Sequence, residues 1–445
     1  MWSHRTLWPT EPDTGGRIPL GGQYQPMKLR FLGGAREVGR SAILVDDRLL
    51  LDCGMTTDSP PSSPLGAGAS GGNRLDPEAV VVTHGHLDHG GAVPALLSGR
   101  PRPPVHWTPP TRDLTLALAR DTLKLHGQSP LCPFTREDVA RLTEVSQPHG
   151  YGESFTAAGY EITLFNAGHI PGSAPVLVDD GETRLLYTGD FSTTEQRLVA
   201  PTTERPPADV VVCESTYSDV VHEDRSAIED RFVERVRTTL WEGGTAIVPA
   251  FAIGRTQELL CVCAANDLDA YVDGMGTAIT RTLREHPDFV RDHDALGDAI
   301  SNARFVDGGD GQRRRIAREN NLVITTAGML GGGPAMTYIP EIADSPTNTV
   351  AMTGYQVQGT PGRELLDTGR AEIDGRVMPV SATVEAFDFS AHADRDGLLS
   401  VLDAYDDARV LVNHGDRCAA FAAELREEGF TASAPAIGDE LDLSA

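Results

Sequence analysis

The chain has 445 residues, of which 64 are acidic and 38 are basic, so its formal net charge is −26. This excess of carboxylates argues against a generic basic nucleic-acid binder. Its apolar runs are broken by Gly, Pro or charged residues and stay well short of the roughly 20 residues that a membrane span needs. We therefore expect a cytoplasmic protein that makes no membrane contact and that contains two or three domains.

Lysine is nearly absent from the sequence. Lys28 and Lys124 are the only lysines, so arginine carries almost all of the positive charge. A surface dense in carboxylates holds water and cations, and high ionic strength screens its self-repulsion. A GC-rich genome that replaces Lys by Arg would explain the missing lysines but not the acidity. The composition therefore favours a salt-rich cytoplasm, as in a halophile.

Residues 1–26 are rich in Gly, Pro and Thr and lack an apolar core, which predicts either a disordered N-terminal extension or a mis-assigned start codon. From residue 27 onward, short aliphatic and β-branched runs separated by turns predict strands. The first strands are expected at 28–32, 41–45, 48–52 and 79–83, with a loop rich in Pro, Ser and Gly at 56–74. Helical periodicity follows at 112–126 and 135–145. Further strands are expected at 161–166, 174–178 and 184–187.

From residue 209 to about residue 379 the pattern changes, and predicted strands alternate with predicted helices. Such alternation is typical of a mostly parallel sheet covered by helices. The strands are expected at 210–213, 246–248, 322–325 and 349–352, and the helices at 227–241, 255–265 and 276–285. One strand, 408–413, and one helix, 417–428, end the chain. The pattern thus predicts an α/β protein.

The segment VVVTHGHLDHGG, residues 80–91, places metal-binding residue types at the end of an apolar strand. His84 and His86 project to the same side of an extended turn, while Asp88 and His89 begin a helix from which they can reach a second ion. Imidazole and carboxylate suit zinc, and positions left open to water make such a site catalytic. A solvated histidine cluster is the alternative, but the buried strand before it argues against that interpretation.

Two metal ions need more ligands than this segment holds. His169, Asp190 and His414 are candidates, because each follows a strand-like run in a glycine-containing turn where the backbone can approach an ion closely. A single residue of this kind is usually an ordinary loop residue. Its recurrence in equivalent contexts favours metal ligation.

Together with Asp52, this ordered set resembles the five motifs of the metallo-β-lactamase superfamily. The resemblance implies an αββα sandwich that binds two Zn²⁺ ions, with Asp190 bridging the ions and Asp52 orienting ligand imidazoles. It implies that one ion is held by His84, His86 and His169, and the other by Asp88, His89 and His414.

The stretch between Asp190 and His414 is too long for a single-domain member, and it resembles the β-CASP domain inserted in nucleic-acid-cleaving members. Glu214 begins ESTY, which resembles motif A, and FSAHAD, with Ser390 and His392, resembles motif B. The opening LGGAREVGRSAILV is closer to archaeal homologues of the cleavage and polyadenylation specificity factor endonuclease, in the short form without KH domains. The implied boundaries are 27–208 and 380–445 for the metallo-β-lactamase domain and 209–379 for the β-CASP α/β domain, with its mostly parallel sheet.

The resemblance implies a zinc-dependent ribonuclease that hydrolyses RNA phosphodiester bonds in 3′-end processing, transcription termination or decay. His392 would protonate the leaving 3′ oxygen or bind the scissile phosphate, since imidazole titrates near neutral pH. Asp88 and Glu214 would be further catalytic residues. Glu214 is better explained as a hydrogen-bond partner of His392 or of hydroxide than as a metal ligand.

An acidic protein must hold single-stranded RNA through local contacts. The candidates for these contacts are Ser390, Arg255, Arg363 and a basic cluster of Arg313, Arg314 and Arg315. Arginine suits bidentate contact with phosphate. A solvated helix face is the alternative interpretation of the Arg313 cluster.

Several alternatives stay open beside an endonuclease with some 5′-3′ exonuclease activity. One is a predominantly 5′-3′ exoribonuclease of the RNase J type. Another is a small-molecule metallohydrolase, which the large insertion opposes, and a third is a non-catalytic RNA-binding scaffold, which the intact ligands oppose. DNA repair nucleases share the architecture. A homodimer and an RNA-processing or transcription complex are both open as assemblies.

Overall fold

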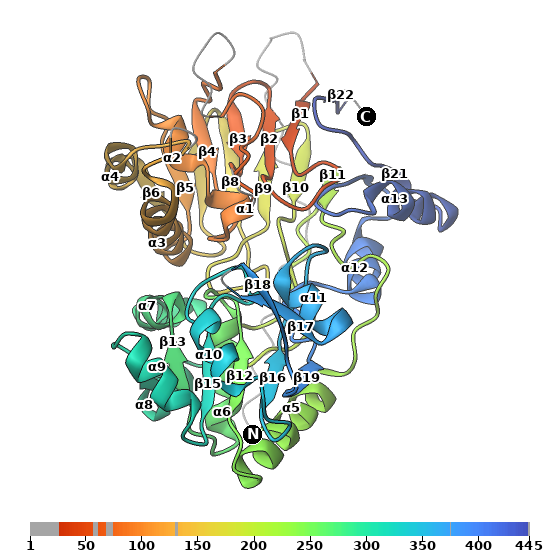
Figure 1. Cartoon of the computed structure of the whole chain (residues 1–445). Coiled ribbons are helices and arrows are strands. Elements are labelled where there is room, and N and C mark those ends of the chain that lie inside the picture. Colours follow the sequence, from red (N-terminus) through yellow and green to blue (C-terminus); the bar gives the residue numbers. More distant parts are fainter. Residues whose placement is uncertain (1–25, 57–60, 68–73, 130–131, 374, 444–445) are drawn as a thin grey trace.

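The computed structural model describes residues 26–56, 61–67, 74–129, 132–373 and 375–443 (Figure 1). The predicted disordered extension, residues 1–26, lies outside the described residues except for Pro26, as does much of the predicted 56–74 loop. Within the described residues, no helix has both the length and the hydrophobicity that a bilayer-spanning segment requires.

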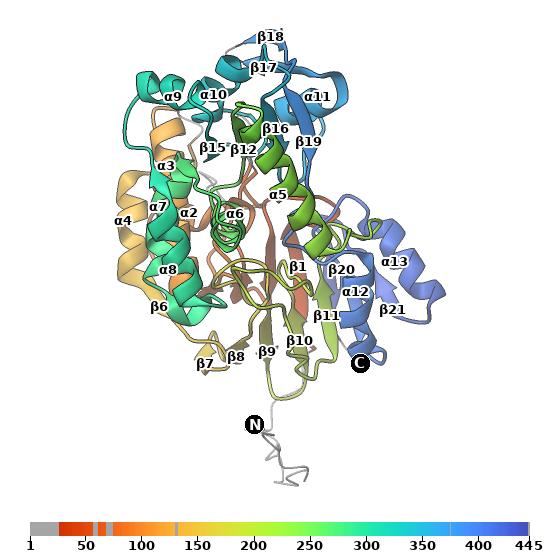
Figure 2. The same cartoon turned by 90° about the horizontal axis from the view of Figure 1, so that it is seen from below.

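The first domain contains two seven-stranded sheets that pack face to face (Figures 1 and 2). The first sheet has the order β22-β1-β2-β3-β4-β5-β6. Its strands are β1 (Lys28–Gly33), β2 (Ala42–Val45), β3 (Leu49–Leu51), β4 (Ala79–Val81), β5 (Val105–Trp107), β6 (Ser146–Pro148) and β22 (Glu440–Asp442). Strands β3 to β6 pair in parallel, and the others pair antiparallel.

The second sheet has the order β21-β20-β11-β10-β9-β8-β7. Its strands are β7 (Ser154–Ala157), β8 (Tyr160–Leu164), β9 (Val176–Asp179), β10 (Arg184–Tyr187), β11 (Val210–Cys213), β20 (Arg409–Val412) and β21 (Thr431–Ser433). Strands β10, β11, β20 and β21 are parallel to one another, so their carboxyl ends lie at one edge of the sheet.

Alternating side chains explain why this domain forms layers. Phe31 and Val178 point into the core between the two sheets, whereas their neighbours along each strand point outward. The outer face of the first sheet is covered by α1 (Leu87–Gly90), α2 (Val93–Leu96), α3 (Pro109–His126) and α4 (Arg136–Val145). The outer face of the second sheet is covered by α12 (Arg395–Leu402), the short 3₁₀ turn η2 (Asp403–Tyr405) and α13 (Cys418–Glu427). The predicted αββα sandwich is therefore confirmed.

Local sequence signals explain where α3 and α4 begin. The α3 helix starts three residues before its predicted first residue, because Thr108 caps it and Pro109 and Pro110 occupy the first turn, where a missing N–H has no consequence. In α4, Thr135 and Asp138 form a reciprocal capping box. The α4 helix ends at Val145 and leads directly into β6, which begins at Ser146.

The inserted domain is built on a six-stranded sheet in the order β14-β13-β15-β12-β16-β19, in which every pair is parallel. Its strands are β12 (Ala246–Pro249), β13 (Tyr271–Asp273), β14 (Arg304–Phe305), β15 (Leu322–Thr325), β16 (Thr349–Met352) and β19 (Thr383–Ala386). Ala246 and Val248 face one side of the sheet and Ile247 faces the other, so both faces are buried. This confirms the predicted parallel α/β architecture.

Helices cover both faces of this sheet (Figure 1). One face packs against α5 (Arg225–Trp241), α6 (Arg255–Ala265) and α8 (His293–Asn302). The other packs against α9 (Asp310–Ala317), α10 (Ala335–Ile342) and α11 (Pro361–Thr368). The remaining elements are α7 (Met275–Arg284), the 3₁₀ turn η1 (Pro287–Phe289) and the hairpin of β17 (Arg370–Ile373) and β18 (Arg376–Pro379).

Strand pairing places both domain boundaries closer to the C-terminus than the predicted positions, residues 209 and 379. Strand β11 pairs with β10 and β20 in the second sheet of the first domain, and β19 pairs with β16 in the inserted domain. The predicted boundaries followed the onset and end of strand and helix alternation along the chain. One of the two partners of β11 is β20, which lies far downstream in the chain. Local hydropathy carries no information on such a pairing.

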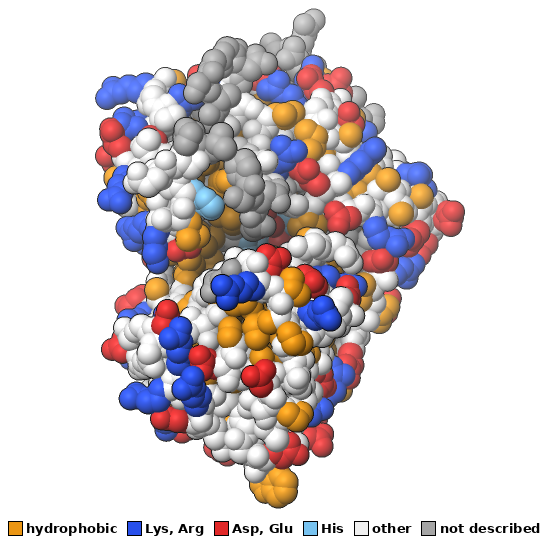
Figure 3. Space-filling model, in the orientation of Figure 1, with side chains coloured by type: hydrophobic (Ala, Val, Ile, Leu, Met, Phe, Trp, Pro, Cys, Tyr) orange, Lys and Arg blue, Asp and Glu red, His pale blue; other side chains and the backbone are white. Residues whose placement is uncertain are grey.

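The two domains meet around α3 and α7 (Figure 2). Leu114 of α3, Ile170, Ile253 and two residues of α7, Ile279 and Leu283, form a small buried cluster. In the space-filling view a hollow lined in part by hydrophobic side chains separates the upper and lower domains (Figure 3).

Candidate metal centre

The predicted ligands converge because each follows a strand of the first domain. Strand β4 leads into His84, and α1 carries Asp88 in its first turn and His89 in its last turn. Asp190 follows β10 and His414 follows β20, whose parallel carboxyl ends lie at one edge of the sheet. His169 lies in the loop between β8 and β9. His84, His89, His169, Asp190 and His414 are buried.

The ligand atoms form two compact sets that share one residue. One set is His84, His86, His169 and Asp190, and the other is Asp88, His89, Asp190 and His414; within each, the atoms lie within 4.8 Å of one another. His86 contributes Nδ1, which lies 3.1 Å from His84 Nε2 and 3.0 Å from His169 Nε2. These sets match the two ligand groups that the sequence resemblance implies.

Asp190 lies between the two sets and presents one carboxylate oxygen to each. Its Oδ2 is 3.5 Å from His84 Nε2 and 3.8 Å from His169 Nε2. Its Oδ1 is 3.3 Å from His89 Nε2 and 3.6 Å from His414 Nε2. A carboxylate in this position can bridge two cations.

Two polar atoms at the centre of this cluster have no hydrogen-bond partner among the described residues. They are His89 Nε2 and Asp190 Oδ1, and both are buried. An unsatisfied buried polar atom costs about 1–3 kcal/mol, so native structures rarely retain one without a ligand. The nitrogen and oxygen donors suit zinc, and a divalent cation between them would satisfy both atoms.

Asp52 orients one of the ligand imidazoles through a hydrogen-bond network. Its Oδ2 accepts a hydrogen bond from His89 Nδ1 at 2.7 Å and another from the Tyr187 hydroxyl at 2.9 Å. The backbone N–H of Thr83 donates to Asp52 Oδ1 at 2.7 Å, and the Thr83 hydroxyl contacts both oxygens. The carboxylate therefore fixes which nitrogen of His89 faces the metal centre.

Three other ligands are also held through their distal nitrogens. Thr83 Oγ1 lies 3.1 Å from His84 Nδ1, and Ser41 Oγ lies 2.9 Å from His414 Nδ1. His169 Nδ1 donates to the backbone carbonyl of Ala391 at 2.8 Å. Sequence reasoning did not single out Ser41, Thr83 or Tyr187. Thr83 could have been found because it is next to His84 in the sequence. Ser41 and Tyr187 are distant in sequence from the residues they contact, so only the tertiary fold brings them to the site.

The ionisation states in this cluster suit metal binding. Burial lowers the pKa of His84 and of His169 well below the usual histidine value, which keeps both imidazoles in the neutral form that binds metals. Burial alone would raise the pKa of Asp190, but the neighbouring His414 and His89 lower it well below the usual value. Burial also works to lower the pKa of His89, yet Asp190 and Asp52 raise it, and a cation would displace that proton.

His392 stands beside the cluster and is anchored by Glu214. Its Nδ1 lies 3.1 Å from Glu214 Oε2 and 3.2 Å from Oε1, and its ring centroid is 4.5 Å from that of His169. Burial works to lower the pKa of His392, but Glu214 and Asp190 together raise it to about 9. The backbone N–H of His392 donates to Ser390 Oγ at 3.1 Å, which shapes the loop that carries it.

Asp190, Glu214 and His392 also lie close enough to hold an ion between them. Glu214 already accepts a hydrogen bond from the backbone N–H of Phe191 at 2.9 Å, and a weaker one from Thr216 N at 3.4 Å. Its carboxylate therefore already has hydrogen-bond partners, and its predicted role as the partner of His392 stays a prediction.

The predicted phosphate-binding arginines are not brought together. Arg313, Arg314 and Arg315 lie on α9 and form ion pairs with Asp273, Glu341 and Glu319, respectively. Arg363 pairs with Asp367 on α11. Arg255 is buried and donates to the backbone carbonyl of Thr353, and burial together with Arg225 lowers its pKa to about 10.

Three family models match consecutive parts of the chain. Residues 35–224 match the metallo-β-lactamase superfamily, residues 257–365 match the β-CASP domain, and residues 377–435 match the Zn-dependent metallo-hydrolase RNA specificity domain. The chain is 30% identical to the probable RNase MJ4 of Methanocaldococcus jannaschii, with 94% of this chain and 100% of that protein aligned. The chain belongs to the β-CASP branch of the metallo-β-lactamase superfamily. The resemblance found in the sequence is thereby confirmed.

Further relatives place this β-CASP protein among archaeal homologues. RNase aCSPSF2 of Saccharolobus solfataricus is 35% identical, over 93% of this chain and 85% of that protein. The transcription termination factor FttA of M. jannaschii is 30% identical, over 92% and 70%. A crystal structure of a protein of unknown function from Enterococcus faecalis superposes with a TM-score of 0.60 at 13% identity, covering 94% of this chain and all of that chain, which shows a shared fold. The metallo-β-lactamase fold implies a divalent metal, and the His and Asp cluster could hold one.

Proposed function

We propose that the protein is a zinc-dependent ribonuclease that hydrolyses RNA phosphodiester bonds in the cytoplasm. The observation that carries the proposal is the position of Asp190 between two buried ligand sets in a β-CASP protein, with an unsatisfied oxygen directed at one set. The relatives that carry ribonuclease and termination-factor names support this assignment.

The two ligand sets would hold two Zn²⁺ ions. His84, His86 and His169 would bind one ion, Asp88, His89 and His414 the other, and Asp190 both. A bound zinc pair lowers the pKa of water and supplies positive charge beside a phosphoryl group. The side chain of Asp88 is 27% exposed, against at most 3% for Asp190 and His414, so it can accept a hydrogen bond from the attacking water.

His392 would act as the general acid. Glu214 holds its Nδ1, which leaves Nε2 to face the substrate. The attacking water gives a proton to the carboxylate of Asp88 as its oxygen bonds to phosphorus, the bond from phosphorus to the 3′ oxygen breaks, and His392 donates its proton to that oxygen. The products carry a 5′-phosphate and a 3′-hydroxyl group. The carboxylate of Glu214 at Nδ1 favours the protonated imidazolium form that a general acid needs.

An aromatic surface beside His392 suits single-stranded RNA. The ring of Tyr217 lies 5.8 Å from that of His392, and Tyr355, which is 52% exposed, lies 6.0 Å from Tyr217. Tyr217 is buried, so the exposed ring of Tyr355 is the one that could stack on an unpaired base, with little sequence preference. Buried Arg255 holds the Thr353 carbonyl, so we assign it a positioning role for Tyr355, while Ser390 and Arg363 remain candidates for direct contact.

The proposal is tested with zinc-loaded protein, circular RNA, linear RNA and DNA of the same sequence, at low and high potassium. We expect cleavage of circular RNA, products with 5′-phosphate ends, and no turnover after zinc is removed. Cleavage restricted to linear RNA with a free 5′ end would identify a 5′-3′ exonuclease instead. Turnover of DNA alone, or of small thioesters or lactams alone, would contradict the ribonuclease assignment.

Mass measurement in the same samples tests whether the protein forms a homodimer, and recovery with RNA polymerase tests whether it belongs to a transcription complex.

A further inference from the structure

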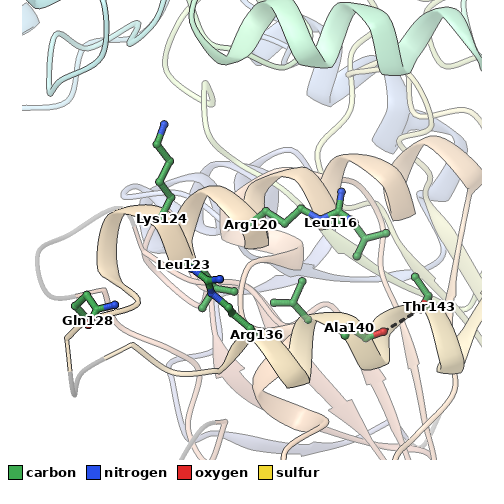
Figure 4. A pocket seen from close by; sticks show the side chains of 9 residues that line it. Leu116, Arg120, Leu123, Lys124, Gln128, Arg136, Ala140 and Thr143 are labelled. Atoms are coloured by element: carbon green, nitrogen blue, oxygen red, sulfur yellow. Dashed lines mark hydrogen bonds between the residues drawn. The ribbon is translucent and has the colours of Figure 1, made fainter.

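An open groove of about 680 Å³ lies between α3 and α4, outside the metal centre (Figure 4). Its floor includes Leu116, Leu123 and Val139, of which Leu116 and Val139 are buried. Arg120 and Lys124 reach it from α3, and Arg136 reaches it from the start of α4. The groove thus combines an apolar floor with a basic rim.

These three cations differ from most of the basic side chains in the protein. Arg120, Lys124 and Arg136 are exposed, and within the described part of the chain their side chains form no hydrogen bond or ion pair. Lys124 is moreover one of only two lysines. In a chain with a net charge of −26, three adjacent cations without a carboxylate partner form a local positive surface.

The carboxylates of the same two helices do not neutralise this surface, because most of them have other partners. Glu137 and Asp138 bind Arg141, Glu144 binds Arg102, and Asp113 binds Arg112 and His286. The exception is Asp121, which interacts electrostatically with Lys124 and whose pKa is raised by burial. Arg120 and Arg136 therefore have no carboxylate partner among the described residues of the two helices.

Helix α3 links the groove to a loop of the metal centre. Thr108 and Thr111 at the start of α3 donate hydrogen bonds to the carbonyl of Gly172, in the loop that carries His169. Leu114 packs on Ile170 of the same loop. At a rise of 1.5 Å per residue, Arg120 and Lys124 lie about 9 Å and 15 Å farther along the helix axis than Leu114. A polymer that leaves the cleft along α3 would meet these cations in turn.

We propose that this groove binds a single-stranded segment of the RNA substrate that extends beyond the cleft. Arg120, Lys124 and Arg136 contact its phosphates, and the apolar floor receives its bases or riboses. The inference rests on the proposed ribonuclease function. An acidic peptide would match the charges equally well, but the position of the groove on the helix that packs against the His169 loop favours the substrate itself.

The test compares a triple variant, R120Q/K124Q/R136Q, with a matched control, R30Q/R48Q/R184Q. The control removes the same number of positive charges, but from arginines of the first domain that already have carboxylate partners. Each zinc-loaded protein is titrated by fluorescence anisotropy with a short RNA that fills only the cleft, and with the same RNA carrying an unstructured extension. KM and kcat are measured in parallel, and melting curves verify folding.

We expect the groove variant to bind the extended RNA about tenfold more weakly, with a matching rise in KM and no change in kcat or in short-RNA binding. Three lost phosphate contacts should reduce the slope of log Kd against log salt by about 2. The control variant should behave as the unmodified protein.

Equal binding of the extended RNA by the groove variant and the unmodified protein would overturn the proposal. So would an equal loss by both triple variants, which would indicate a general effect of net charge. Loss of a protein partner with RNA binding intact would instead assign the groove to an acidic partner. If no protein cleaves either RNA, the ribonuclease assignment fails, yet the difference in extended-RNA binding still reports on the groove.

Discussion

Two regions of this protein gather charged and ionisable side chains, and they differ in whether those side chains have partners. At the metal centre, His89 Nε2 and Asp190 Oδ1 are buried without a hydrogen-bond partner among the described residues. On α9, Arg313, Arg314 and Arg315 each face a carboxylate. In the sequence both regions appear as dense clusters. The difference shows that unsatisfied groups, rather than charge density, mark a binding site.

Magnitudes support this distinction. Exposed ion pairs such as Arg315 with Glu319 contribute about 0–1 kcal/mol to stability and need no further ligand. The buried atoms of the metal centre carry a penalty of about 1–3 kcal/mol each until a cation satisfies them. Three substitutions test whether the metal centre behaves as this comparison requires, and a fourth tests a carboxylate that has partners at the junction between the domains. They follow in order of expected effect.

The largest effect is expected for Asp190→Asn. An asparagine offers one oxygen and no charge, so it cannot bridge the two ligand sets. We expect the bound zinc to fall by at least one ion and the kcat for RNA to fall about ten-thousandfold. Elemental analysis and cleavage assays measure both. Asp47→Asn, at an exposed carboxylate of the same domain, is the control, and full zinc content in D190N would contradict the bridging role.

The second largest effect is expected for His392→Ala. His392 is outside the two ligand sets, so the variant should retain its zinc while kcat falls about a thousandfold through loss of the proton donor. Zinc content and single-turnover cleavage distinguish the two properties. His293→Ala, at an exposed histidine of α8, should change neither. Full cleavage activity in H392A would remove His392 from the mechanism.

A smaller effect is expected for Asp52→Asn. The amide can no longer accept a charge-assisted hydrogen bond from His89, so the imidazole loses its fixed orientation. We expect zinc affinity to fall about 10–100-fold, with RNA cleavage restored by excess zinc. Competition with a chromogenic chelator measures the affinity. An unchanged affinity would show that Tyr187 and Thr83 are sufficient to order the site.

The smallest effect concerns the junction between the domains. Burial would raise the pKa of Asp113, but hydrogen bonds from His286 and Arg112 lower it to about 2. Because the folded pKa lies below the unfolded value, this carboxylate stabilises the fold above about pH 4 and loses that contribution as the pH falls toward 2. The group is partly exposed, so Asp113→Asn should lower the free energy of unfolding at pH 7 by about 1 kcal/mol. Urea denaturation should show a constant difference from pH 7 to pH 5 and a narrowing difference as the pH falls from about 4 toward 2, and a difference that stays constant down to pH 2 would contradict the linkage.

Much of the metal centre could be predicted from the sequence. The His84, His86, Asp88 and His89 segment follows an apolar strand, and the same context recurs at Asp190 and His414. Such patterns are local, and the order of the motifs identifies the family. The composition also predicts a salt-rich cytoplasm, which stays a prediction.

Only the tertiary structure decided which polar and charged groups have a hydrogen-bond or ion-pair partner. Strand β11 pairs with β20, Ser41 meets His414, and each oxygen of Asp190 faces a different ligand set. Arg313 appeared available in the sequence but binds Asp273, whereas Arg120 was unremarkable in the sequence but has no partner among the described residues. Sequence patterns report periodicity over a few residues, while hydrogen-bond and ion-pair partners are set by strand register and domain closure between distant segments.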